Sequence, residues 1–110
     1  MNWYVAKIIY NINLEKGMYA PEFDEQLRLI EASSPEEAFS KARKIGKEGE
    51  ESFKMNDRKT IINWEFIDVM EVLELELSNG SEISSSIQEK TSGYINFIKE
   101  KALNLQNTIA

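Results

Sequence analysis

The side chains best suited to chemistry are five carboxylates in the second half of the sequence: Glu65, Asp68, Glu71, Glu74 and Glu76. Carboxylate oxygens are the hard ligands that Mg²⁺ and Ca²⁺ prefer, and a close pair can act as acid and base. Spacings of two and three residues, however, place these side chains on both faces of a strand, and no calcium loop of the EF-hand type accompanies them. Charged residues also protect strand edges from aggregation. The pattern favours a solvated edge over a metal site.

Two residue types that carry much of enzyme chemistry are missing, because the sequence contains no Cys and no His. Disulfides, zinc–thiolate sites and thiol catalysis require sulfur, and His is the usual general base near neutral pH. The glycine motifs of phosphate-binding loops, dinucleotide-binding folds and hydrolase nucleophile elbows are absent as well. We therefore expect a protein that is not an enzyme and that uses no cofactor or metal.

The charge balance argues against a nucleic-acid partner. The 110 residues include 13 Lys and Arg against 19 Asp and Glu, a formal net charge of −6, which repels a phosphate backbone. A local exception would need a basic cluster such as Lys41, Arg43, Lys44 and Lys47, with Arg58 and Lys59 nearby. Glutamates follow this cluster directly, and basic residues near a helix C-terminus complement the helix dipole. We expect no nucleic-acid binding.

Five aromatic residues offer another way to bind bases, by stacking: Trp3, Tyr4, Tyr10, Trp64 and Phe66. No RNP-type pattern accompanies them, and large aromatics in strands usually belong to a core or an interface. We expect core packing or oligomer contacts from this group.

The N-terminus lacks the charged start and apolar run of a signal peptide, and no stretch approaches the length of a membrane span. The sequence therefore predicts a cytoplasmic protein with no membrane partner.

Alternation with a period of two predicts two strands in the first third of the chain. Over residues 3–12, one parity is wholly apolar and the other is partly so. In residues 23–32, Phe23, Leu27 and Leu29 lie on one side and Asp24, Gln26 and Arg28 on the other, as expected of a strand with one side in water. We expect these strands to pair antiparallel through a connection at 14–21.

A helix is predicted to begin at Ser34-Pro35-Glu36-Glu37. Ser34 can cap a free amide, Pro35 suits the first helical position, and Glu37 completes a capping box. Small residues then recur at helical spacing, which allows close packing on a sheet. Gly46 and Gly49 indicate fraying or termination of the helix near these positions.

The following segment predicts a short strand at 53–55 and a long strand from Thr60 onward. Ile62, Trp64 and Phe66 share one parity, but Ile67, Val69, Leu73, Leu75 and Leu77 lie on the other. A regular strand would turn its apolar face over midway. We infer a bulge or bend near Ile67 and Asp68, or a strand that is covered on both sides.

The C-terminal region begins with a turn signal at 78–81 and continues with overlapping capping boxes at Ser85 and Ser86. Apolar residues then recur in steps of three and four: Ile87, Thr91, Tyr94, Ile98, Ala102, Leu105 and Ile109. This pattern predicts an amphipathic helix, which is marginal alone and should pack on the second sheet face or on a neighbouring subunit. The candidate interface residues are Trp3, Tyr94, Ile98 and Leu105.

Four stretches occur in a set order: residues 3–10 (WYVAKIIY), 23–32 (FDEQLRLIEA), 34–38 (SPEEA) and 64–69 (WEFIDV), followed by Glu74-Leu75. In this order they resemble a family of short bacterial proteins catalogued as a domain of unknown function, the 4288 series, over about residues 3–77. The resemblance implies a compact strand-strand-helix-strand domain and no assigned activity. The stretch from Ser78 lies outside it.

Together these features predict an α+β fold: an antiparallel sheet of three or four strands, one helix after the second strand, and a C-terminal amphipathic helix. Residues 1–77 would form the core domain, and residues 78–110 a linker and a helix packed on the core or on a partner subunit. The leading hypothesis for function is a non-enzymatic protein-interaction or regulatory module, homo-oligomeric or bound to another protein. Two alternatives stay open: an acidic, immunity-like protein that neutralises a toxin, and a small carboxylate-dependent protein that binds a metal or ligand.

Overall fold

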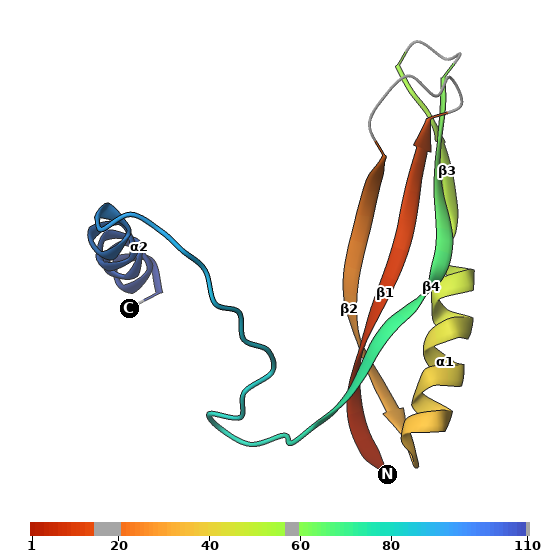
Figure 1. Cartoon of the computed structure of the whole chain (residues 1–110), viewed down its shortest axis with the longest axis horizontal. Helices are drawn as coiled ribbons and strands as arrows, with labels where there is room; N and C mark the ends of the chain where they lie inside the picture. The colour runs from red at the N-terminus through yellow and green to blue at the C-terminus, as the bar shows by residue number, and fades with distance from the viewer. Residues whose placement is uncertain (15–20, 57–59, 110) are drawn as a thin grey trace.

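The computed structural model describes residues 1–14, 21–56 and 60–109. Four antiparallel strands form one sheet in the order β2-β1-β4-β3, with one helix after β2 and another at the C-terminus (Figure 1). The elements are β1 (Asn2–Leu14), β2 (Glu22–Ala32), α1 (Pro35–Glu48), β3 (Glu51–Lys54), β4 (Ile61–Leu75) and α2 (Gly93–Ile109). The expected α+β architecture is confirmed. Most of the predicted connection at 14–21, together with Arg58 and Lys59, lies outside the described residues.

Strand β1 is the centre of the sheet. It pairs antiparallel with β2 on one side and with β4 on the other, so both of its edges are hydrogen-bonded. Tyr4, Ala6, Ile8 and Tyr10 point to the face that α1 covers and are almost completely buried. The predicted pairing of the first two strands is confirmed, and the central position of β1 explains why it is the most apolar strand.

Helix α1 begins where its capping residues predict. The Ser34 hydroxyl accepts the Glu37 backbone N–H at 3.1 Å, and Pro35 occupies the first helical position. The Glu37 carboxylate accepts the backbone N–H of Ser33 at 3.1 Å and also the Ser33 hydroxyl. The reciprocal half of the predicted capping box is therefore made one residue earlier than Ser34. Both bonds fix the direction in which the chain enters the helix.

Small residues on α1 bring the helix close to the sheet. Ala38 and Ala42 are fully buried, and a Cβ atom on Gly46 would overlap the Phe66 ring. A Cβ atom on Gly49 would likewise overlap the Tyr10 hydroxyl. The helix ends at Glu48 with Gly49 as its C-cap, which confirms the predicted termination near these two glycines. Gly46 is a packing residue inside the helix, and only Gly49 lies at its end.

The face of β2 that points to α1 is the reverse of the one that alternation indicated. Ile30 and Ala32 are buried with Tyr4, which places Leu27 and Leu29 on the opposite, uncovered face. The reason is that α1 follows β2 directly and covers its C-terminal end. The parity of Ile30 and Ala32 then fixes the side of every other residue in the strand.

Strand β4 contains two bulges, whereas the sequence predicts one. Its register with β1 shifts once at Ile67, which confirms the predicted bulge, and again at Met70. The first shift keeps Val69 on the covered face with Phe66, and the second brings Leu73 and Leu75 onto the uncovered face opposite Val5 and Trp3. A single bulge would have placed both leucines under α1.

The C-terminal segment leaves the sheet at the end of β4. Gly80 adopts a left-handed φ of 87° in the predicted turn, where the Ser81 N–H donates to the Ser78 carbonyl at 3.2 Å. Helix α2 begins at Gly93, so the predicted capping boxes at Ser85 and Ser86 do not start it. Starting there would place Gly93 inside the helix, at a cost of about 1 kcal/mol relative to Ala.

Helix α2 stands apart from the rest of the protein (Figure 1). Within the described residues it makes no contact with any other helix or strand, and none of its residues is buried. The predicted packing of this helix on the second face of its own sheet is therefore not seen.

Replacing Gly46→Ala should lower the stability of the protein. The added methyl group meets the Phe66 ring, and overpacking of this kind costs about 1–3 kcal/mol, more than the helix-propensity gain of up to about 1 kcal/mol. Urea unfolding at neutral pH measures the difference. A second change, Phe66→Leu, should restore part of the loss, and a G46A protein as stable as the original would contradict this packing.

Tyr10 provides a pH-dependent contribution to stability. Its hydroxyl donates to the Gly46 carbonyl at 2.8 Å, and burial raises the pKa of Tyr10 above its ordinary value of 10.0. The folded state thus holds this proton more tightly than the unfolded state, so the contribution is present below pH 10 and is lost as the pH rises beyond it.

The substitution Tyr10→Phe should cost about 1 kcal/mol at pH 7, the usual contribution of one such hydrogen bond. Above pH 10 the difference in unfolding free energy between the two proteins should narrow. Denaturant unfolding across this pH range measures it, with Tyr94→Phe as the exposed control. A difference that grows with pH would argue against the buried hydrogen bond.

Candidate functional site

The five carboxylates do not gather into a site. Asp68 receives both of its 2.9 Å hydrogen bonds from the Arg43 guanidinium, and Glu71 lies 3.9 Å from the Lys7 ammonium. The Arg43 hydrogen bonds, with a further one from the Val69 N–H, hold the pKa of Asp68 below its ordinary value. Within residues 1–14, 21–56 and 60–109, no group of three or more acidic side chains is placed to hold a metal ion.

The basic cluster on α1 is largely paired with carboxylates. The Lys41 ammonium lies 3.0 Å from the Glu37 carboxylate and donates to the Glu31 carbonyl at 2.8 Å. Lys47 lies 2.7 Å from Glu50, and Arg43 is bound to Asp68. The Lys41 bond to Glu31 joins α1 to β2, and the Arg43 pair joins it to β4. The pairs with Glu37 and Glu50, in contrast, are local to α1 and its C-terminal end. Most of the cluster's charge is thus paired at the helix surface.

The aromatic residues are divided between the two faces of the sheet. Tyr4 and Tyr10 are buried beneath α1, and Trp64 and Phe66 pack against the same core. The Tyr10 and Phe66 rings meet edge to face at 6.1 Å. Trp3 alone points to the other side, as its position beside Tyr4 requires. Four of these aromatics therefore act as core residues, and no platform is formed.

The unusual surface is the side of the sheet that faces away from α1, which we call the open face. It consists of outward residues from three adjacent strands: Trp3, Val5, Lys7, Ile9, Leu27, Leu29, Leu73 and Leu75. Leu27, Leu29 and Leu73 are 55%, 62% and 44% exposed. In register, Val5 lies between Leu29 and Leu73, so the exposed leucines flank one strip of apolar surface.

Charged residues border this strip. Lys7 and Glu71 form their ion pair beside Leu27 and Leu73, and Glu25 and Glu31 occupy the same face of β2. The carboxylates outnumber the single ammonium group, which gives the open face a negative rim. An apolar centre with a polar rim is the usual arrangement of a protein–protein interface.

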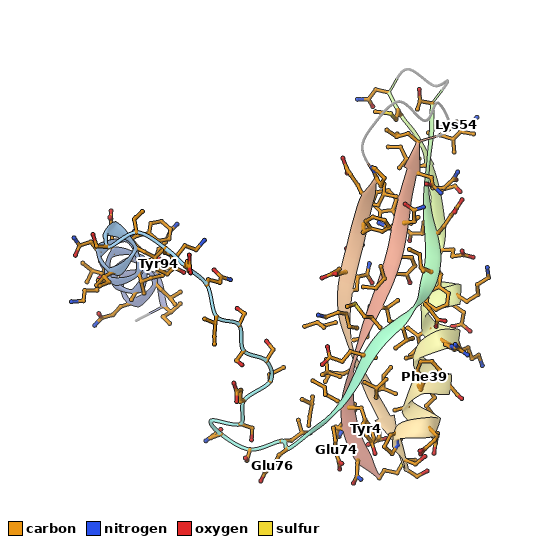
Figure 2. All side chains as sticks on the ribbon, in the orientation of Figure 1. Tyr4, Phe39, Lys54, Glu74, Glu76 and Tyr94 are labelled. Carbon is orange, nitrogen blue, oxygen red and sulfur yellow. The ribbon has the colours of Figure 1, made fainter. Side chains whose placement is uncertain are left out.

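The segment after β4 passes in front of the open face. Glu82, Ile83 and residues 84–86 line a groove of about 550 Å³ together with Val5, Lys7, Leu27, Glu71 and Leu73. Figure 2 shows the chain leaving the sheet beyond Glu74 and Glu76 and carrying Tyr94 to a helix well away from it. The groove is thus a partial cover, with most of the leucine surface left in solvent.

Helix α2 carries an apolar seam. Its members recur at intervals of three and four residues: Ile95, Ile98, Ala102, Leu105 and Ile109. All of them are exposed. Lys99 and Lys101 flank the seam on opposite sides, since helical geometry turns successive residues by about 100°. The seam thus has a basic border on both sides, and the exposed Phe97 and Leu103 lie outside it.

The predicted interface residues therefore fall on two separate surfaces. Trp3 lies on the open face, and Tyr94, Ile98 and Leu105 lie on α2. The Tyr94 ring stacks on Phe97 at 6.0 Å and lies beneath the Lys90 ammonium at 5.7 Å, so its contacts are local. The structure does not bring the two surfaces together.

The sequence analysis missed three exposed leucines, Leu27, Leu29 and Leu73. The first two lie on the side of β2 that was expected to be covered, and the third is placed by the second bulge. A usable signal was present, because Ile30 and Ala32 lead directly into the capped helix and fix the covered parity of β2. The second bulge had no comparable signal.

Comparison with known families assigns the core of the chain. Residues 3–85 match the family described as Domain of unknown function (DUF4288). The chain belongs to this family. The match extends beyond the predicted limit near residue 77 and includes Glu82 and Ile83, so the segment across the open face is part of the DUF4288 domain, whereas α2 lies outside it. No match was found among curated proteins or among solved structures.

A search of the described residues of this DUF4288 protein found no helix with the length and apolar character needed to cross a membrane.

Replacing Arg43→Gln should raise the pKa of Asp68 toward its ordinary value of 3.8, because the guanidinium is the main cause of its lowering. Carboxyl chemical shifts followed by NMR during an acid titration measure this directly. Lys47→Gln provides the control, since it removes a cation of α1 that pairs with Glu50 instead. An unchanged Asp68 midpoint in R43Q would refute the ion pair between α1 and β4.

Proposed function

We propose that this DUF4288 protein is a non-enzymatic protein-interaction module that self-associates, as a homodimer, through the open face of its sheet. The observation that carries the proposal is the strip of exposed leucines on that face, bordered by carboxylates. Single exposed leucines are common on soluble proteins, but a contiguous patch from three strands marks an interaction surface.

Apolar burial on both partners would favour such an association. Full burial of a leucine side chain contributes about 1.5–3 kcal/mol, so covering the exposed half of each of three leucines contributes roughly 1 kcal/mol apiece. A two-fold symmetric dimer uses each open face once, which doubles the gain. Aromatic area from Trp3 would add to it.

The chemistry of the polar residues also supports an interaction role over catalysis. Asp68, Glu37 and Glu50 have lowered pKa values because they accept hydrogen bonds from neighbouring cations, hydroxyls or backbone amides. A general base needs a pKa near the working pH, and these shifts move the carboxyl groups away from it. The contacts of Asp68 and Glu50 join α1 and the segment after it to β4, and those of Glu37 hold the start of α1.

A second candidate function, neutralisation of a basic partner, is favoured by where the charge lies. Residues 1–77 contain 10 Lys and Arg against 16 Asp and Glu, whereas residues 78–110 contain three of each. The whole net charge therefore belongs to residues 1–77, the part of the sequence that contains the four strands and α1. Association with a basic protein through this surface would weaken steeply with added salt, whereas association through leucines would not.

Self-association is tested by sedimentation equilibrium of the full chain at micromolar concentration, with Leu29→Glu as the disrupting variant. We expect a dimer for the natural chain, insensitive to salt, and an increase of at least about tenfold in the dissociation constant for L29E. The increase reflects lost apolar burial and the cost of burying a charge.

Ile87→Glu is the matched control, because it introduces the same charge at a fully exposed position outside the sheet and α2. Its dissociation constant should equal that of the natural chain. A natural chain that is monomeric at these concentrations would remove the proposal.

A further inference from the structure

Each chain carries two apolar surfaces without a partner, the open face of the sheet and the seam of α2. We infer that they are partners of each other between chains, so that α2 of one copy lies on the open face of a second copy, and the reverse. This inference rests on the proposed self-association and names the element that covers the face. It describes an exchange of identical segments about a two-fold axis.

The dimensions of the two surfaces agree. Helix α2 has 17 residues, a length of about 25 Å at 1.5 Å per residue. The open face follows β1 from Trp3 to Ile9, about 20 Å at 3.3 Å per residue, with the Lys7–Glu71 ion pair between its two apolar ends. One helix therefore covers the strip along its length, as α1 does on the other side of the sheet.

The charges agree as well. Lys99 and Lys101 border the seam of α2 on both sides, and Glu25, Glu31 and Glu71 border the leucines of the open face. Seating the seam on the leucines brings these ammonium and carboxylate groups to the same rim. Complementary charges at a rim orient two surfaces even where they add little affinity.

The course of the chain favours a second copy over the same copy. The segment that lines the groove leaves the end of β4 and carries α2 away from its own sheet (Figure 1). The radius of gyration is 18.8 Å, whereas a compact chain of this length has about 13 Å. A 17-residue helix without tertiary contacts is marginally stable, so its seam needs a surface, and α2 makes no contact with the sheet of its own chain.

Disulfide trapping tests the inference cleanly, because the natural sequence contains no Cys. One full-length variant carries Leu73→Cys on the open face, and another carries Ile98→Cys on the seam. The two are co-expressed, oxidised mildly and separated without reductant. We expect a mixed disulfide dimer, and at least about tenfold less of it when Asn96→Cys, on the opposite side of α2, replaces Ile98→Cys.

A chain that carries both L73C and I98C distinguishes the alternative arrangement. An intramolecular disulfide in this chain, with no mixed dimer from the separate variants, would show α2 on its own sheet and overturn the inference. Absence of both disulfides while sedimentation still reports a dimer would also overturn it and leave the proposed self-association standing. Absence of both disulfides in a monomeric protein would remove the two together.

Discussion

One helix covers one face of a sheet, and this constraint governs the whole molecule. Apart from Val5, which is buried on the open face, the buried core consists of residues between α1 and the sheet, and its largest fully buried side chains, Tyr4, Ile8 and Tyr10, all come from β1. Everything on the far side of β1 depends on cover from elsewhere. The exposed leucines of the open face are the direct consequence, because β1, β2 and β4 all place apolar residues there.

The attachment of α1 decides which side of the sheet is left open. The Ser34 cap starts the helix directly after β2, Gly46 and Gly49 allow it to approach Phe66 and Tyr10, and Arg43 binds Asp68 beside the first bulge of β4. These contacts leave little freedom for α1 to move to the other face. The two bulges of β4 then decide which of its residues lie on each face. The first keeps Val69 on the face covered by α1, and the second places Leu73 on the open face.

The sequence predicted the features that depend on neighbouring residues better than the contacts between residues far apart in the sequence. The Ser34-Pro35 start, the first strand pair and a bulge near Ile67 were all readable, because each depends on neighbouring residues in the sequence. The second bulge at Met70 and the packing role of Gly46 depend on what lies opposite in space. The capping patterns at Ser85 and Ser86 do not start α2, because a helix that began there would contain Gly93 in its interior.

The central claim is that the open face is covered in solution, and the methyl groups of Leu27 and Leu29 report on it most directly. NMR relaxation caused by a soluble paramagnetic agent measures how far each methyl group is exposed. The account predicts that both methyl groups become protected as the protein concentration rises into the range of self-association, while those of Leu77, outside the sheet, stay exposed. Full exposure of Leu27 and Leu29 at every concentration would contradict it.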